Sequence, residues 1–430
     1  MELIEIIEWD ENMKQNNIIG KIVAFTLSYM LLFSLSACGK KGVDIASTQI
    51  DVGTEYISLA PTAASALPVV PTSAPNSTQI DLLPITASAG YPYTPTSLYF
   101  LDTQTGWVNC GLYLFKTEDE GQTWATITMD ESHYFIKMCF VDENNGWAFD
   151  NVGGDYTMCA LLCTIDGGAH WTTIMKAAYG SDDMRFFDSE NGIILFNKRL
   201  FRTMDRGQTW ADVTPSDLDF ILGQMSFLDG ENGWVCGWVP ISGDDNIVRK
   251  ATIYRTNDGG KTWMEQWSAK DYENLNGITY ALDFVNETDG WLILGVDGIS
   301  GYLYRTTDGG DSFQIDNDFI AIGHPLLTGM SFIGDAIGWL SYRTNAMGHP
   351  GGLSRITSDG AVISTISDEY NYSSFFAVTF PSLEVGFAIG TNGPPDDYYG
   401  FMIGTIDGGK TWQHIALPEP DAELMSTPLS

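Results

Sequence analysis

The sequence of 430 residues is poor in basic residues. It has 21 Lys and Arg against 55 Asp and Glu, which gives a formal net charge of −34. A chain without a surplus of positive charge cannot neutralise nucleic-acid phosphates or bind anionic lipids by electrostatic attraction. We therefore expect no nucleic-acid partner, and we interpret most of the acidic side chains as a solvated surface.

Several motifs that mark active sites are also missing. The chain has no Gly-rich phosphate loop, no Cys-x-x-Cys pair and no nucleophile elbow, and its five histidines do not cluster. Beyond Cys38 it has five cysteines, an odd number that cannot pair completely. We expect no cofactor, no metal and mostly free buried thiols, with one disulfide left open as an alternative.

The N-terminus contains one apolar run, "IVAFTLSYMLLFSL" (22–35), which follows Lys14 and Lys21 and is short for a membrane span. Positive residues, a short apolar run and small residues before a cleavage site are typical of a secretory signal peptide. The sequence "LSAC" (35–38) resembles the bacterial lipobox, and this implies that Cys38 carries a lipid. The alternative is a plain signal peptide with an incidental Cys. Residues 1–12 are acidic and fit no signal, so Met13 is the expected start.

These features predict an outward-facing lipoprotein of a bacterial cell membrane, divided into four parts. The signal covers 1–37, and Cys38 with a Ser-, Thr-, Pro- and Ala-rich linker covers 38–95. Low apolar content and frequent Pro prevent such a linker from forming a core, so it is expected to act as a tether. The folded domain is expected at 96–418 and a C-terminal tail at 419–430.

The folded domain is built from two motifs that alternate along the chain, each in seven copies. One reads F-x-D-x-x-x-G-W, as in "FLDGENGW" (227–234), and the other reads T-x-D-G-G-x-T-W, as in "TNDGGKTW" (256–263). Strand-like segments of the fourth repeat lie at 224–228, 234–239, 251–256 and 261–267. No helical periodicity appears, and the repeat is near 48 residues. The sequence therefore predicts an all-β, seven-bladed β-propeller with four antiparallel strands per blade.

The residues of the second motif suit a tight turn. Gly permits positive φ, Asp accepts hydrogen bonds from backbone amides, and Trp offers a large area to bury between blades. Repetition of the same residues in every blade favours architecture over catalysis. The structural residues are Asp119, Asp166, Asp205, Asp258, Asp308, Asp359 and Asp407, with the aromatics Trp124, Trp171, Trp210, Trp263, Phe313 and Trp412.

This motif resembles the Asp-box, or BNR repeat, of sialidases and sortilin-type receptors. The paired motifs are still more similar to the photosystem II stability/assembly-factor family and its relatives in non-photosynthetic bacteria. The resemblance implies a propeller but is weakly specific for function. Photosystem binding is not carried over, because the arginines are few and scattered. Arg202, Arg255 and Arg305 precede the motif Thr, and we expect them to pair with neighbouring acids.

Function is expected on the face opposite the repeated turns, in loops that do not repeat. Aromatic and acidic side chains in these loops suit recognition of a peptide or a sugar. The candidate ligand-binding residues are Trp238, Asp244, Asp245, Tyr272, His324, His349, Asp396, Asp397, Tyr398 and Tyr399. We expect a monomeric binding or assembly scaffold for a protein or glycan. The alternative is a glycoside hydrolase or lyase that uses acidic residues of these loops; sialidase activity is not expected, because the Arg-Ile-Pro segment of that family is absent.

Overall fold

The computed structural model describes residues 94–418 except 112, 130–132, 153–157, 179–180, 217–220, 242–247, 269–277, 297–299, 316–325, 334–336, 344–350, 358–361, 367–373 and 393–398. All described residues belong to one compact unit, Ser73–Ser430. They form β-strands only, with no helix that could cross a membrane. The signal, the linker and the C-terminal tail lie outside the described residues, so these predictions stay untested.

The strands fall into seven consecutive groups of four. The first three groups are β1 Ser97–Phe100, β2 Gly106–Cys110, β3 Tyr113–Thr117, β4 Ala125–Ile127; β5 Phe135–Phe140, β6 Gly146–Asn151, β7 Met158–Thr164, β8 Thr172–Ala178; β9 Ser181–Phe186, β10 Gly192–Phe196, β11 Arg199–Thr203, β12 Ala211–Asp212. The next two are β13 Ile221–Phe227, β14 Gly233–Ile241, β15 Val248–Thr256, β16 Met264–Ser268; β17 Ile278–Phe284, β18 Gly290–Val296, β19 Ser300–Thr306, β20 Gln314–Ile315. The last two are β21 Leu326–Ile333, β22 Ile337–Arg343, β23 Gly352–Thr357, β24 Val362–Ile366; β25 Ser374–Thr379, β26 Gly386–Asn392, β27 Tyr399–Thr405, β28 Gln413–His414.

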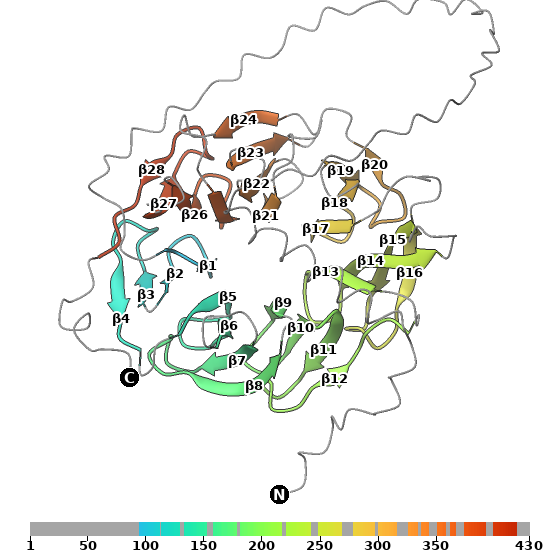
Figure 1. Ribbon diagram of the computed structural model, residues 1–430, viewed down its shortest axis with the longest axis horizontal. Coiled ribbons are helices and arrows are strands. Elements are labelled where there is room, and N and C mark those ends of the chain that lie inside the picture. Colours follow the sequence, from blue (N-terminus) through green and yellow to red (C-terminus); the bar gives the residue numbers. More distant parts are fainter. Residues whose placement is uncertain are drawn as a thin grey trace, which may run out of the picture. The chain divides into compact units, whose positions relative to one another are not determined.

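Each group forms one antiparallel sheet in which the strands follow their order in the sequence. Figure 1 shows the seven sheets arranged as blades around a centre, with the first strand of each blade innermost. We call β1, β5, β9, β13, β17, β21 and β25 the inner strands. The predicted seven-bladed propeller is confirmed. Among the described residues no blade takes a strand from another part of the chain, so side-chain packing closes the ring.

The F-x-D-x-x-x-G-W motif supplies that packing. The Phe lies at the end of an inner strand or one residue from it, and the residue after Gly lies near the start of the second strand. In five blades this residue is Trp, and its ring stacks on the Phe of the next blade; the pairs are Trp107–Phe140, Trp147–Phe186, Trp234–Phe284, Trp291–Phe332 and Trp339–Phe380. Blade 3 has Ile193 instead, which packs in one buried cluster with Phe227. The motif therefore encodes the contact between blades.

The Gly of the same motif makes room for the Phe. A Cβ atom added to Gly106 would lie 2.6 Å from the ring of Phe100, and the same collision occurs in every blade. Each Phe thus lies between the Gly of its own blade and the aromatic ring of the preceding one, or Ile193 in the case of Phe227. Close packing of this kind leaves no space for even one methyl group.

The ring closes with the same contact. Phe387 of blade 7 takes the place of Trp and stacks on Phe100 of blade 1, with ring centroids 4.0 Å apart and planes 6° apart. Both rings are buried in a cluster that also contains Trp124 and Leu417. Blade 7 therefore meets blade 1 as any other pair of neighbours meets.

The T-x-D-G-G-x-T-W motif forms the turn between strands three and four, which we call the TxD turn. In blade 5, Thr306 Oγ1 donates to Asp308 Oδ1 (2.7 Å) and accepts from the Gly310 amide (2.9 Å). Asp308 also accepts from the backbone and side chain of Ser312. The same bonds occur in the described turns of blades 1, 2, 3, 4 and 7, with His170 in the place of Ser312 in blade 2.

The TxD turn is also joined to the turn between strands one and two. The Gly309 amide donates to Thr288 O (2.8 Å), and Trp234 of the preceding blade donates to Gly309 O (2.9 Å). Both turns of a blade therefore lie on one face of the ring, as the sequence predicts. The opposite face carries the starts of the inner strands and the loops between strands two and three.

Candidate functional site

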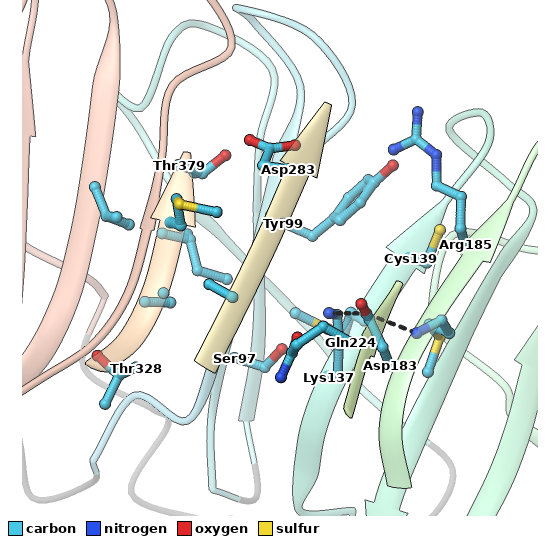
Figure 2. Close-up of a pocket in the computed structure, with 18 of the residues that line it drawn as sticks. Ser97, Tyr99, Lys137, Cys139, Asp183, Arg185, Gln224, Asp283, Thr328 and Thr379 are labelled. Atoms are coloured by element: carbon cyan, nitrogen blue, oxygen red, sulfur yellow. Dashed lines mark hydrogen bonds and ion pairs between the residues drawn. The ribbon is translucent and has the colours of Figure 1, made fainter. Parts of the chain in front are cut away.

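A cavity of about 600 Å³ lies at the centre of the ring and is lined by all seven inner strands. Such a volume is in the range of small-ligand sites. Figure 2 shows the side chains that line it. Each inner strand has no neighbouring strand on the edge that faces the cavity. The backbone amides on this edge therefore need another hydrogen-bond partner.

The residue before each motif Phe supplies that partner in several blades. We call these seven side chains the collar: Tyr99, Cys139, Arg185, Ser226, Asp283, Ser331 and Thr379. Four of them accept a hydrogen bond from the Phe amide of the next blade; they are Cys139 to Phe186, Ser226 to Phe284, Asp283 to Phe332, and Ser331 to Phe380. The collar therefore joins neighbouring blades at the wall of the cavity.

Two collar positions differ in chemistry. Tyr99 reverses the direction of the bond, because its hydroxyl donates to Phe140 O (2.7 Å). Arg185 has only donors and cannot accept from the amide of Phe227 in blade 4. Its side chain is exposed to the cavity, and Figure 2 shows it extending toward the hydroxyl end of Tyr99. Within the described residues it makes no hydrogen bond or ion pair.

A second layer lies two residues earlier on the inner strands. It contains Ser97, Lys137, Asp183, Gln224, Ala281, Gly329 and Ala377. Lys137 forms an ion pair with Asp183, whose carboxylate also accepts from the Met184 amide (2.8 Å). Blades 1–4 therefore present polar side chains at this level, and blades 5–7 present only Ala or Gly.

The cavity environment shifts three pKa values upward. Burial raises the pKa of the Tyr99 hydroxyl and of the Cys139 thiol, so both are neutral at physiological pH. Burial also raises the pKa of Asp283 to about 6, although the Phe332 amide and Arg185 both favour its ionised form. The charge of Asp283 thus changes near neutral pH.

Asp283→Asn should stabilise the protein at pH 7.5 by about 2 kcal/mol. The folded pKa of about 6 lies above that of an unfolded aspartate (about 3.9), so the folded form binds more protons between these values. The wild type therefore gains stability as pH falls from 6 to 4, whereas the Asn variant does not. Urea unfolding at pH 7.5 and 4.5 should show the advantage of the variant shrinking at the lower pH. An advantage of equal size at both pH values would contradict the pKa of Asp283.

The TxD turns hold their carboxylates by hydrogen bonds. Bonds from Thr262 lower the pKa of Asp258 to about 2. In Asp308, the bonds from Ser312 and Thr306 outweigh the effect of burial, and the pKa is again lowered. A carboxylate that is held ionised at a turn has no proton to donate and is engaged by its own loop. This geometry suits a structural role.

Most candidate ligand-binding residues lie outside the described residues. These are Asp244, Asp245, Tyr272, His324, His349, Asp396, Asp397 and Tyr398, and they stay predictions, as does the TxD residue Asp359. Trp238, at the end of a predicted strand and the start of a predicted loop, and Tyr399, expected in a loop, lie in β14 and β27, paired with Ala251 and Asn392. Both hairpins extend further than expected, because backbone pairing continues past the apolar segments that marked the strands.

The three motif arginines follow the expectation only in part. Arg255 pairs with Glu287 (3.7 Å) and Arg305 with Asp289 (3.4 Å), and each lies over the Trp of its own blade. Arg202 instead donates to the carbonyl oxygens of Gly230 and Gly259. The prediction of an acidic partner for Arg202 was wrong, because its guanidinium reaches the carbonyl oxygens of two turns. All three arginines are engaged in the framework.

Two further observations concern disulfide bonds and metal binding. The five cysteines Cys110, Cys139, Cys159, Cys163 and Cys236 form no disulfide with one another, and all but Cys163 are buried. Among residues 94–418, as far as they are described, no group of three or more His, Cys, Asp or Glu side chains is placed to hold a metal ion.

Sequence reasoning missed the collar. The sequence does contain a signal for the collar. The position just before the motif Phe reads Tyr, Cys, Arg, Ser, Asp, Ser and Thr in the seven repeats. A position that varies among polar residues inside a constant motif is one that the framework does not fix. In this fold six of its seven residues line the central cavity, all but Ser331.

Comparison with known proteins agrees with the fold. No protein-family model matches the chain, and no curated protein matches it. A GH74 xyloglucanase from Xanthomonas campestris is 10% identical over 76% of this chain and 54% of its own, with a TM-score of 0.51. A PL25 ulvan lyase is 11% identical over 78% of this chain and 98% of its own (TM-score 0.50). YCF48 with a bound D1 peptide is 18% identical over 74% and 95% (TM-score 0.49). At these identities the likeness concerns the propeller fold, which serves several functions.

Proposed function

We propose that this chain is a binding module whose central cavity receives part of a protein or glycan ligand. One observation carries the proposal: the repeated residues are engaged in the framework, whereas the polar residues that differ between blades line one cavity of about 600 Å³. A rigid ring that presents unlike side chains toward one space is suited to recognition. The predicted lipid on Cys38 would hold this module at the outer side of the cell membrane.

Capture of a partner from cell-envelope extract tests the proposal. The full-length protein in detergent is compared with Gln224→Trp, which places a large ring in the cavity, and with Gln122→Trp, which adds the same ring to an exposed TxD turn. We expect Gln224→Trp to lose the captured partner and Gln122→Trp to retain it. Equal capture by all three proteins would contradict a binding site in the cavity.

The membrane anchor has its own test. Cells that make Cys38→Ala should release the protein from the membrane fraction, whereas the wild type should stay with the membrane and incorporate labelled fatty acid. Two acyl chains bind a bilayer stably, so the wild type should not be extracted by high salt. Membrane retention of Cys38→Ala at the wild-type level would contradict the lipid anchor.

One observation favours a second candidate, a glycoside hydrolase or lyase. A carboxyl group with a pKa of about 6, such as Asp283, is suited to donate or accept a proton near neutral pH. The second carboxylate of the cavity, Asp183, is however paired with Lys137, and Asp283 itself accepts from the Phe332 amide. Turnover of a panel of glycosides and polysaccharides that disappears in Asp283→Asn would favour the enzyme over the binding module.

A further inference from the structure

At four of the seven blade junctions the collar follows a rule that Arg185 cannot follow. At the junctions of blades 2–3, 4–5, 5–6 and 6–7, a collar oxygen or sulfur accepts from the Phe amide of the next blade. At the junction of blades 3 and 4 the collar residue is Arg185, which can only donate. Arg185 therefore cannot accept from the Phe227 amide, and its guanidinium, which extends toward the hydroxyl end of Tyr99 in Figure 2, has no hydrogen-bond or ion-pair partner among the described residues.

The charges around the cavity leave Arg185 as the unpaired cation among its described lining residues. The titratable or charged groups that line it are Tyr99 on β1, Lys137 and Cys139 on β5, Asp183 and Arg185 on β9, and Asp283 on β17. Lys137 and Asp183 neutralise each other in an ion pair. Tyr99 and Cys139 are neutral because burial raises the pKa of each. The strands β13, β21 and β25 contribute no charged side chain to the cavity.

We propose that Arg185 anchors an anion-binding subsite in the central cavity, and that the group it binds is a carboxylate. This inference rests on the proposed function and names the chemistry of the ligand that enters the cavity. The planar guanidinium fork matches a carboxylate in a bidentate arrangement.

A carboxylate fits the charge balance better than a sulfate or a phosphate. Asp283 is close enough to Arg185 for each to influence the other, so above its pKa it leaves the subsite with little net positive charge. A monovalent anion is then tolerated, whereas a dianion meets the repulsion of Asp283. When Asp283 takes up a proton near pH 6, this repulsion ends. Binding should therefore strengthen in mild acid.

The test uses N-acetylglycine as a small carboxylate, N-acetylglycinamide as its neutral analogue and inorganic sulfate as a dianion. Binding to the full-length protein in detergent is measured by ligand-observed NMR at pH 7.5 and 5.0, where the carboxylate of the probe stays ionised. We expect N-acetylglycine to bind about fivefold more tightly at pH 5.0. The amide should not bind, and sulfate should bind more weakly than N-acetylglycine at pH 7.5.

Three variants decide the outcome. Arg185→Gln should weaken the binding of N-acetylglycine at least about tenfold, whereas Arg199→Gln, which changes an exposed arginine on the outer part of blade 3, should leave it unchanged. Asp283→Asn should bind at both pH values as the wild type binds at pH 5.0. No binding of N-acetylglycine, or equal binding by Arg185→Gln, would overturn the subsite. If sulfate binds as tightly as N-acetylglycine at pH 7.5, the assignment of the bound group as a carboxylate is overturned.

The partner-capture experiment separates this inference from the proposed function. If Gln224→Trp loses the partner but Arg185→Gln keeps it, the cavity binds a ligand without a carboxylate at Arg185, and the subsite fails alone. If Gln224→Trp also keeps the partner, the proposed function fails. Loss of the partner in both variants supports both conclusions.

Discussion

Phe387→Ala should lower the free energy of unfolding by about 4 kcal/mol, the range seen for removal of a buried aromatic ring. Phe387 is 2% exposed and stacks on Phe100, which makes it the central contact between the last blade and the first. No exchanged strand reinforces this junction, so the lost ring is not compensated by backbone pairing. Urea unfolding followed by intrinsic fluorescence measures the effect.

Phe387→Trp is the matched control, because five other blades carry Trp at this position. It should retain most of the stability, provided that the larger ring is accommodated at a cost below that of the alanine cavity. Limited proteolysis should cut Phe387→Ala faster than either the wild type or this control. Stability of Phe387→Ala within 1 kcal/mol of the wild type would show that something else closes the ring.

Thr306→Val should destabilise the protein by about 3 kcal/mol, because it leaves a buried backbone amide without its acceptor. Thr306 is 1% exposed, and its hydroxyl both accepts from the Gly310 amide and donates to Asp308. Valine keeps the shape but makes neither bond. The carbonyl of Gly309 in this turn also accepts from Trp234, so loss of the turn geometry reaches the neighbouring blade.

Ser312→Ala is the control within the same turn. Ser312 is exposed, and its hydroxyl can exchange Asp308 for water, so the loss should be well below that of Thr306→Val. Thermal unfolding of the two variants gives the comparison. A larger effect of Ser312→Ala than of Thr306→Val would mean that the exposed side of the TxD turn holds it together, contrary to the geometry described above.

The ring was predictable because its contacts repeat. Phe, Gly and Trp of one motif serve the same packing in most blades, and Thr, Asp and Gly of the other make the same hydrogen bonds in the six described turns, so their spacing reveals the number of blades. Even the closing contact follows the pattern, with Phe387 in the place of Trp. The strand ends were less predictable, since pairing in β14 continues through Pro240 to Ile241, beyond the apolar residues that marked the strand.

The cavity was less predictable because its residues do not repeat. Arg185 and Asp283 occupy equivalent positions of the F-x-D motif, yet only the folded ring brings them to one space. From the sequence, Arg185 is one polar residue within a strand, and the pKa of Asp283 depends on its burial against blade 6. The loops that sequence analysis favoured lie largely outside the described residues, and their candidate residues stay predictions.

Photo-crosslinking in living cells tests most directly the claim that the cavity, and not the repeated turns, binds the ligand. A photoreactive benzophenone amino acid is placed either at Ala377, which lines the cavity, or at Gln122, on the exposed TxD turn of blade 1. The account predicts a discrete adduct from position 377 that Arg185→Gln weakens, and none from position 122. Adducts from position 122 alone would contradict it.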